Sequence, residues 1–386
     1  MTTTLRARNA VMWSFALNGF GFTSWASRIP EVRSGLDLSN GELGVLLLVL
    51  SIGSVVALPT TGALVHRWGA AAVVRAGLVI DVVGLVGAGV AAQWLGSYVL
   101  TAAALAAYGV GVAVWDVAMN VEGAAVEIGL GRAIMPRFHA AWSIGSVSGA
   151  LVGSGLVGLG VPMMAHLAAS ALLMVAVGIT GTRSFLPSTG QPHDADAGPS
   201  SLLGAWLEPR TLLIGVMMLS LALTEGSAND WLAVALIDGY DLPHWVGVAG
   251  FGVFVTAMTT GRFFGPAFLD RHGRVPVLWV TMAMAAAGIL LIVFGGHPLL
   301  VVPGIVIWGI GASLGFPVGI SAASDDPAHA AARVSVVTSI AYTAFLAGPP
   351  FLGFVADHVG TLNALLVIAA LLIPSALVVP AARRRA

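Results

Sequence analysis

Residues 73–94 read VVRAGLVIDVVGLVGAGVAAQW, an apolar and glycine-rich run that is interrupted only by Arg75, Asp81 and Gln93. As a helix this run would rise about 33 Å, enough to cross the roughly 30 Å hydrocarbon core of a membrane. Backbone polar groups in hydrocarbon must be satisfied within the segment itself. The run therefore predicts a membrane-spanning α-helix, and its lack of period-two alternation argues against a strand of a membrane β-barrel.

Similar runs recur along the whole chain, so we predict an all-α membrane protein with twelve transmembrane helices. The predicted spans are about 9–29, 42–65, 73–94, 97–121, 137–160, 162–182, 210–237, 244–267, 275–295, 298–321, 333–355 and 361–381. The 386 residues are 58% hydrophobic and only 9% charged, whereas a soluble domain carries about 25% charged residues. This composition excludes a water-soluble enzyme.

The charged residues and the missing cysteines narrow the range of partners. All 17 basic residues are arginines, and with 18 acidic residues the formal net charge is −1, which gives no basic surface for nucleic acid. The absence of cysteine excludes disulfides and zinc–thiolate sites. No histidine pair has metal-ligand spacing on one helix, so we expect neither a metal nor a cofactor. The short basic stretch MTTTLRARNA precedes a full-length apolar run, which indicates a first membrane helix rather than a cleaved signal.

The arginines also predict the orientation of the chain in the membrane. With twelve crossings and a cytoplasmic N-terminus, fifteen arginines, Arg262 among them, lie on or near the cytoplasmic side. Only Arg28 and Arg33 then lie outside. This bias follows the positive-inside rule and places both termini in the cytoplasm.

Two halves of six helices each are predicted, at residues 1–185 and 205–386. The segment 186–204 between them is rich in Pro, Gly and Ser and is typical of a cytoplasmic linker. The tetrapeptide at 66–69, HRWG, matches DRHG at 270–273 with an offset of about 204 residues. Several such matches in chain order indicate a duplication, which is common in secondary transporters.

The loop motif of these two copies resembles that of the Major Facilitator Superfamily, in which Gly-x-Leu-x-Asp-Arg-x-Gly connects helices two and three. The first copy keeps Gly62, Leu64, Arg67 and Gly69, with His66 in the place of the acid. The second copy keeps Asp270, Arg271, Gly273 and Arg274. The resemblance implies that this loop locks the two halves together on the cytoplasmic side. The resulting gate candidates are Arg67, Gly69, Glu122, Glu127, Asp270, Arg271 and Gly273.

A narrower resemblance is to the bacterial YbjJ-type inner-membrane permeases, a branch near the fucose permeases. It rests on the stretches WASRIPE at 25–31, DVAMNVEG at 116–123, PRFHAAWS at 136–143, EGSANDW at 225–231 and GPPFLG at 348–353. It implies a proton-coupled, symporter-like fold with a central cavity in the bacterial cytoplasmic (inner) membrane. It implies no particular substrate.

Acidic residues deep in the spans are costly, which makes them functional candidates. Asp116 lies on the fourth span, and Asn120 follows it by four residues on the same helical face. A carboxyl group in a low-dielectric site can take up and release a proton near neutral pH. The pair also matches the Glu-x-x-x-Asn pattern of the fucose permeases, whose acid carries the proton there. The alternative is a packing residue that a neighbouring arginine or amide satisfies.

The other proton-coupling candidates are Glu225 and His139. Glu225 lies on the seventh span, and Asn229 follows on the same helical face. Asp230 lies near the outer boundary of the membrane, where it could reach water. Its alternative role is to pair with Arg28 as an outer gate. A histidine titrates near pH 6.5 and suits a proton relay, although a satisfied buried histidine is the alternative for His139.

Two interpretations are open for the acids at the cytoplasmic end of the fourth helix. Glu122 and Glu127 could form a state-dependent ion pair with Arg67 or Arg137, or contact substrate. For Asp81 on the third helix we expect a structural partner such as Arg132 or Arg137.

The remaining candidates line a cavity or pack helices together. Aromatic faces suit sugar rings and planar drugs equally, and most membrane tryptophans only pack. The predicted cavity residues are Asn18, Trp115, Asn120, Asn229, Asp230, Trp231 and Trp308. Small residues allow close approach of helices, and prolines allow bending. The predicted packing residues are Gly145, Gly149, Gly153, Gly348, Pro349 and Pro350.

Three functions follow as hypotheses. The first is alternating-access, proton-coupled uptake of a small polar solute, such as a sugar or related metabolite, by a monomer embedded in lipid. The second is a proton-antiporting exporter of drugs or metabolites. One observation argues against it: the fourth helix has no arginine between Leu105 and Trp115, where drug exporters carry a membrane-embedded one. The third, a membrane enzyme or sensor, lacks a Gly-x-Ser-x-Gly elbow and a soluble catalytic domain.

Overall fold

The computed structural model describes residues 2–130, 134–186, 204–323, 325–326 and 329–384. Nearly all of these residues are helical, and the described chain contains no strand. Eleven of the described helices are long and apolar enough to span a membrane. The first predicted span, about 9–29, is the remaining one, and it falls on a helix of 25 residues that is less apolar because it carries Arg6, Arg8 and two asparagines.

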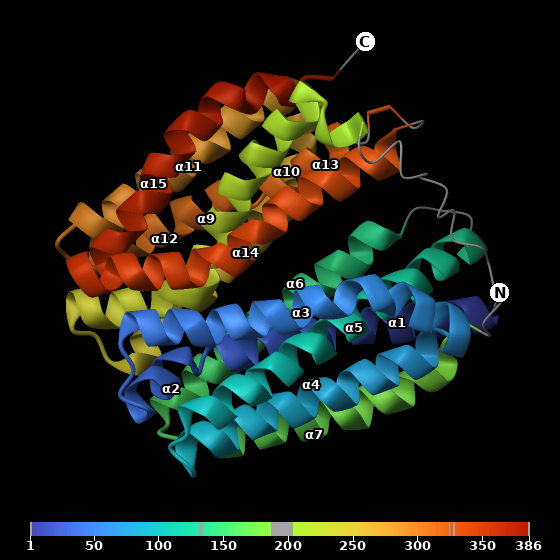
Figure 1. The fold of residues 1–386 in the computed structure, drawn as a ribbon, viewed down its shortest axis with the longest axis horizontal. Coiled ribbons are helices and arrows are strands. Elements are labelled where there is room, and N and C mark those ends of the chain that lie inside the picture. Colours follow the sequence, from blue (N-terminus) through green and yellow to red (C-terminus); the bar gives the residue numbers. More distant parts are fainter. Residues whose placement is uncertain (1, 131–133, 187–203, 324, 327–328, 385–386) are drawn as a thin grey trace. The chain divides into compact units, whose positions relative to one another are not determined.

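The first compact unit comprises the described residues up to Leu186 together with Pro243–Gly252. Its helices are α1 (Thr2–Ala26), α2 (Ile29–Gly35), α3 (Asn40–Trp68), α4 (Ala70–Gln93), α5 (Tyr98–Leu130), α6 (Met135–Gly158), α7 (Met163–Gly181) and the short 3-10 helix η1 (Thr182–Ser184). Within this unit α4 packs against both α5 and α7, and α1 packs against α6 (Figure 1). The short helix α2 was not predicted.

The second unit comprises the described residues 204–242 and those from Val253 onward. Its helices are α9 (Pro209–Tyr240), α10 (His244–His272, whose first residues belong to the first unit), α11 (Arg274–Phe294), α12 (Pro298–Ala312), α13 (Gly315–Ala323), α14 (Ala330–Val359), α15 (Thr361–Val378) and the 3-10 helix η2 (Val379–Ala382). Here α9 packs against α14 and α15, and α11 packs against α12. The predicted linker 186–204 lies almost entirely outside the described residues.

The tenth predicted span, about 298–321, is not one continuous helix. It divides into α12 and α13 at Ser313 and Leu314. The predicted span nevertheless coincides with the candidate membrane span Leu299–Ala323, and only the backbone within it is interrupted.

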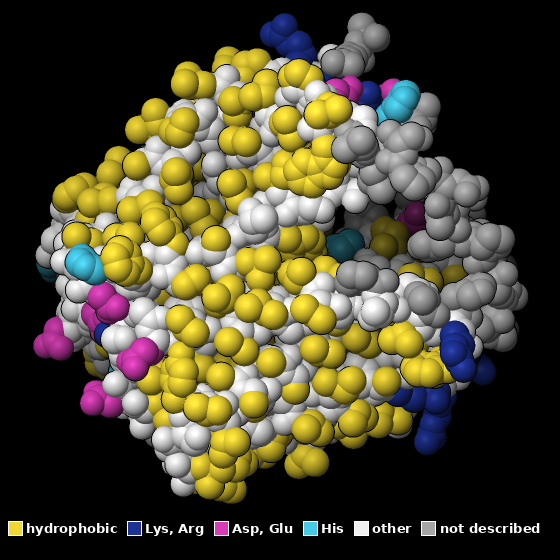
Figure 2. All heavy atoms as spheres, in the orientation of Figure 1, with side chains coloured by type: hydrophobic (Ala, Val, Ile, Leu, Met, Phe, Trp, Pro, Cys, Tyr) yellow, Lys and Arg dark blue, Asp and Glu magenta, His cyan; other side chains and the backbone are white. Residues whose placement is uncertain are grey.

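The surface of the helices is apolar. Val83 on α4 is 64% exposed and Leu172 on α7 is 72% exposed. Figure 2 shows hydrophobic side chains over the sides of the helices, whereas charged side chains gather at helix ends. Lipid is as apolar as leucine, so such side chains lose nothing by facing outward.

Small residues bring the helices of the first unit together. A Cβ atom on Gly84 of α4 would collide with the backbone of Tyr108 on α5, and one on Gly111 of α5 would collide with the backbone of Asp81. Hydrogen bonds add to this packing, because the Thr23 hydroxyl on α1 donates to the Ser146 carbonyl on α6 at 2.8 Å. Close packing and interhelical hydrogen bonds replace the hydrophobic effect inside a membrane.

Glycines end two equivalent helices in a conformation that other residues avoid. Gly69 follows α3 with φ 79° and ψ 154°, and Gly273 follows α10 with φ 78° and ψ 170°. Both dihedral pairs lie in a region that only glycine adopts readily. The motif glycines are thus explained by the sharp turn between consecutive helices.

Replacing Gly69 with alanine is expected to lower the free energy of unfolding by about 1–3 kcal/mol, because a side chain strains this turn. Gly62 provides the matched control, since it lies inside α3, is exposed and has nothing within 4 Å of a built Cβ atom. Gly62→Ala should leave the thermal midpoint in detergent unchanged or raised. An equal loss in both variants would contradict this explanation of the turn.

Candidate functional site

Asp116 and Asn120 lie one turn apart on α5, as their spacing predicts. The Asn120 amide nitrogen donates to the Asp116 backbone carbonyl at 2.9 Å and lies 3.4 Å from the Asp116 Oδ1 atom. Both side chains are half-buried. The amide therefore holds the carboxyl group in a fixed orientation inside the span, where the group can carry a proton or accept a hydrogen bond from a solute.

Asn18 links α1 to α6 in the same unit. Its side-chain carbonyl accepts a hydrogen bond from the Trp142 indole at 2.9 Å. Its amide nitrogen is buried and has no hydrogen-bond partner among the described residues. A buried donor of this kind usually finds a partner, so Asn18 remains a candidate for contact with a solute hydroxyl.

The three predicted cavity tryptophans are buried in the interior of their units. Trp115 on α5 donates its indole hydrogen to the Ser14 hydroxyl on α1 at 2.7 Å. Trp308 on α12 packs edge-on against Phe254, with 5.3 Å between ring centroids, and Trp231 on α9 is 2% exposed. These positions are packing positions in this conformation, and solute contact by the three residues stays a prediction.

His139 and the two glutamates of α5 have different surroundings. His139 on α6 is exposed, and its ring meets Phe15 edge-on at 5.3 Å. Glu122 accepts a hydrogen bond from the Leu186 backbone N–H at 2.6 Å. Glu127 accepts from the backbone N–H groups of Ile134 and Met135, at 2.6 and 2.7 Å, where α6 begins.

In this conformation the two carboxylates contact backbone N–H groups, Arg67 and Arg137 are exposed, and the state-dependent ion pair stays a prediction. The Glu127 carboxylate satisfies N–H groups at a helix start that has no intrahelical acceptor for them. Glu122 in turn holds the chain that follows η1.

Asp81 has no arginine partner in the described part of the chain. Its side chain is 2% exposed, and its Oδ1 atom has no hydrogen-bond partner there. Arg132, one of the two expected partners, lies outside the described residues. The expectation of a charged partner fails for Arg137, because that side chain is exposed at the start of α6.

Arg28 lies between α1 and α2 and is fully buried in the first unit. Its guanidinium contacts the Glu31 carboxylate at 2.5 Å, the His166 Nδ1 atom at 2.9 Å and the Val161 carbonyl at 3.1 Å. His166 is 138 residues away in sequence and was not predicted as a partner.

Glu225 forms a membrane-embedded ion pair in the second unit. Arg262 on α10 donates from Nη2 to both Glu225 carboxylate oxygens, at 2.8 and 2.7 Å. Arg262 lies ten residues before the end of α10, about 15 Å along the helix from that end. Asn229 and Asp230 are half-buried on α9, one turn and five residues beyond Glu225.

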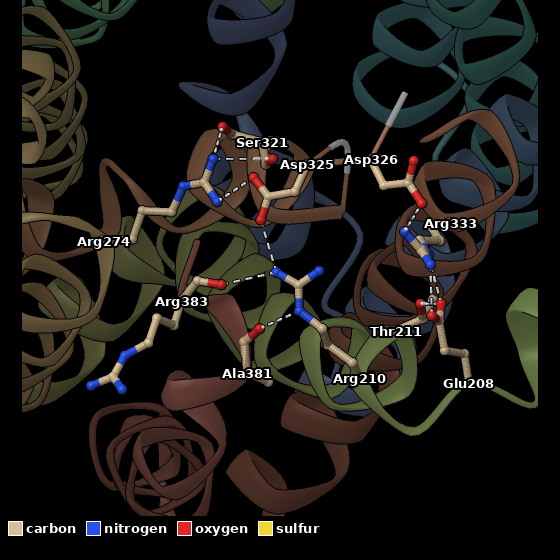
Figure 3. Close-up of polar contacts among 10 residues, drawn as sticks. All are labelled: Glu208, Arg210, Thr211, Arg274, Ser321, Asp325, Asp326, Arg333, Ala381 and Arg383. Carbon is tan, nitrogen blue, oxygen red and sulfur yellow. Dashed lines mark hydrogen bonds and ion pairs between the residues drawn. The ribbon is translucent and has the colours of Figure 1, made fainter. Parts of the chain in front are cut away.

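A second cluster of charges lies at the helix ends shown in Figure 3. Asp325 accepts hydrogen bonds from Arg210 at 2.8 Å and from Arg274 at 2.7 Å. Arg333 binds Glu208 through two nitrogens, each at 2.7 Å. The motif residues Asp270 and Arg271 are exposed at the end of α10. Asp325, which follows α13, therefore connects Arg274 of the second motif copy on α11 to Arg210 on α9.

The Asp325 cluster predicts that the stability of the fold depends on pH. Burial raises the pKa of Asp325, but the hydrogen bonds and charges of Arg210 and Arg274 outweigh it and lower that pKa. A lowered folded-state pKa stabilises the fold above the unfolded value of about 3.9, and the stabilisation is lost as the pH falls through the folded value.

Between about pH 7 and pH 5, Asp325→Asn should therefore unfold at lower temperature than the wild type. The difference should shrink as the pH falls below about 4, because the carboxyl group of the unfolded wild type then binds a proton, and it should vanish once the folded carboxylate is protonated as well. Thermal midpoints in detergent across this range test the prediction, with the exposed Asp37→Asn as control. A difference that stays constant down to the lowest pH would contradict it.

The glycine series on α6 lies against α1. A Cβ atom on Gly145 would collide with the Ala16 backbone carbonyl, and one on Gly149 or Gly153 would collide with Thr23 or Ser27. On α14, Gly348 lies against Leu223 of α9, and Pro349 and Pro350 follow inside the helix. These residues allow close approach of α1 to α6 and of α9 to α14.

Comparisons with known proteins agree with this architecture. The Major Facilitator Superfamily profile matches residues 11–344 and 244–385. An uncharacterized MFS-type transporter of Yersinia pestis is 33% identical over 352 residues, which cover 89% of this chain and 87% of that protein. The membrane protein MosC of Rhizobium meliloti is 28% identical over 369 residues, covering 94% and 86% of the two chains.

Solved structures share the fold at low sequence identity. A mutant of the nucleoside transporter NupG superposes with a TM-score of 0.81 at 16% identity, covering 98% of this chain and 99% of that one. A variant of the Escherichia coli fucose:proton symporter FucP superposes with a TM-score of 0.62 at 15% identity, covering 97% and 100%. With the profile match over nearly its whole length, the chain belongs to the Major Facilitator Superfamily of membrane transporters.

Proposed function

We propose that the protein is a secondary active transporter that takes up a small polar solute together with protons. Alternating access would rock the half 1–185 against the half 205–386 around a site near the membrane midplane. Transport, and not catalysis, would be its role. It would act as a monomer in the bacterial cytoplasmic membrane, with both termini in the cytoplasm.

The observation that carries this proposal is the Asp116–Asn120 pair on α5. An acid inside a membrane span is costly unless it has a function. Here the acid accompanies an amide at 3.4 Å, and no arginine among the described residues neutralises it. The carboxyl group can therefore alternate between protonated and charged states, while the amide orients it toward a solute.

The choice of solute class draws on the fold and on these polar groups. The related folds include a nucleoside transporter and a fucose:proton symporter. Asn18, Asn120 and Asn229 offer neutral amides that suit hydroxyl groups. Sugars, sugar acids and nucleosides are accordingly the first solutes to test.

The test is uptake into liposomes that contain the purified protein. Fucose, glucuronate and uridine, each radiolabelled, are offered with and without an inward proton gradient. We expect at least one of them to accumulate only when the gradient is present. Gradient-driven extrusion of preloaded solute, without accumulation in the uptake geometry, would instead indicate the exporter.

A further inference from the structure

The break between α12 and α13 lies inside a single candidate span, Leu299–Ala323. α12 ends at Ala312 and α13 begins at Gly315. The last carbonyls of a helix lack intrahelical donors, and the end of the helix carries a partial negative charge. The break therefore presents polar backbone groups at membrane depth, where transporters with discontinuous helices bind their solutes.

Arg262 lies against this break. Its Nε atom donates to the Ser313 carbonyl at 3.3 Å, while its Nη2 atom binds Glu225. The neighbouring Gly261 allows the approach, because a Cβ atom there would collide with the Ser313 hydroxyl. The guanidinium is thus held by one helix end and one carboxylate, from α12 and α9.

The ion pair is reachable and not sealed in the interior. The Arg262 side chain is 27% exposed and the Glu225 side chain is 15% exposed. A sealed pair would be a packing feature, whereas part of each side chain of this pair is accessible at the surface.

Glu225 is the principal counter-ion that Arg262 has. The sequences of α12, α13 and α15 contain no acid or base. On α14 the charged residues are confined to the two ends, with the Tyr342 phenol between them. Asp230 lies five residues beyond Glu225 on α9, and five residues do not share a helical face.

The two partners differ in what can neutralise them. The guanidinium stays charged at all physiological pH values, whereas a carboxylate can bind a proton. When Glu225 takes up a proton, Arg262 is left as a positive charge without an anion. Leaving one member of such a pair unpaired is strongly unfavourable, so a second anion is required at that moment.

We propose that Glu225, Arg262 and the Ser313 carbonyl form the binding site for a carboxylate group of the transported solute. A proton adds to the Glu225 carboxylate, its contacts with the Arg262 Nη2 atom open, and the solute carboxylate takes its place at Nη2. No covalent bond forms or breaks. The planar Glu225 carboxylate already occupies the geometry that the solute group would adopt. This inference rests on the proposed function, because it names the chemical class of the solute.

A cationic solute fits the site less well. An ammonium group could bind Glu225 only by displacing Arg262, which cannot lose its charge. The displaced guanidinium would then remain in the span without a counter-ion.

The binding test does not need the natural solute. Glu225→Gln mimics the protonated acid, and acetate serves as the probe carboxylate. We expect acetate to raise the Tm of Glu225→Gln in detergent by at least about 2 °C over chloride at the same ionic strength. The shift should be absent in Glu225→Gln/Arg262→Met and small in the wild type at pH 7.5, where Glu225 occupies the site. Glu225→Ala, whose missing side chain leaves more space, is the second background for the same comparison.

No acetate-specific shift in either background, or the same shift without Arg262, would overturn the inference. The transport experiment separates it from the proposed function. Gradient-driven uptake of a neutral solute that Arg262→Met leaves unchanged would keep the proposed function and refute the carboxylate site. Glucuronate uptake that is lost in Arg262→Met would support both.

Discussion

Gly145→Leu is expected to prevent the first unit from packing, with a loss of about 3 kcal/mol or more in the free energy of unfolding. The new side chain would begin at a Cβ atom that collides with the Ala16 backbone carbonyl on α1. A backbone atom cannot move aside as the end of a flexible side chain can. The helices α1 and α6 would have to separate, which also lengthens the hydrogen bond from Thr23 to Ser146.

The same helix offers a matched control for that substitution. Gly155 on α6 is exposed and has nothing within 4 Å of a built Cβ atom. Gly155→Leu should therefore elute as a monodisperse peak in detergent with a near wild-type thermal midpoint. Equal behaviour of the two leucine variants would show that close approach of α1 and α6 is not required for folding.

Asp116→Asn is expected to reduce gradient-driven uptake to the level of liposomes without protein. An amide cannot bind and release a proton near neutral pH, so the cycle that couples solute to proton fails. Exchange of labelled for unlabelled solute should persist, since the loaded transporter can reorient without a change of protonation. Asn120 can still hydrogen-bond the new amide, which keeps the local structure.

Asp37→Asn is the matched control for the acid-to-amide change. Asp37 is exposed in the loop after α2, and its φ of 51° is one that asparagine tolerates. Its uptake should equal that of the wild type. Wild-type uptake by Asp116→Asn would remove this residue from the proton pathway, and loss of exchange as well would indicate a role in solute binding instead.

Long apolar runs made the helices predictable from the sequence, but the contacts between the helices were not predictable. Eleven of the predicted spans coincide with candidate membrane spans of the described residues, because membrane thickness sets the length and lipid sets the composition. The break at Ser313 could not be predicted, since serine and glycine are as common inside spans as at their interruptions. The only sequence signal for the break was Ser313, which lies two residues before Gly315.

The candidate site was predicted in part for the same reason. The Asp116–Asn120 contact follows from helical spacing alone and needs no tertiary information. The Glu225–Arg262 pair joins α9 to α10, and a contact between two helices depends on tertiary packing that the spacing along one helix does not encode. The burial of Arg28 by His166 depends on packing between α1 and α7, which no local pattern encodes.

The most direct test of proton-coupled transport is proton movement that a solute drives. Liposomes containing the protein and a trapped pH indicator are placed in weakly buffered medium without any imposed gradient. Addition of the solute that accumulated in the uptake experiment should acidify the lumen in the wild type and not in Asp116→Asn. Uptake of that solute with no change in luminal pH would contradict proton coupling and with it the role assigned to Asp116.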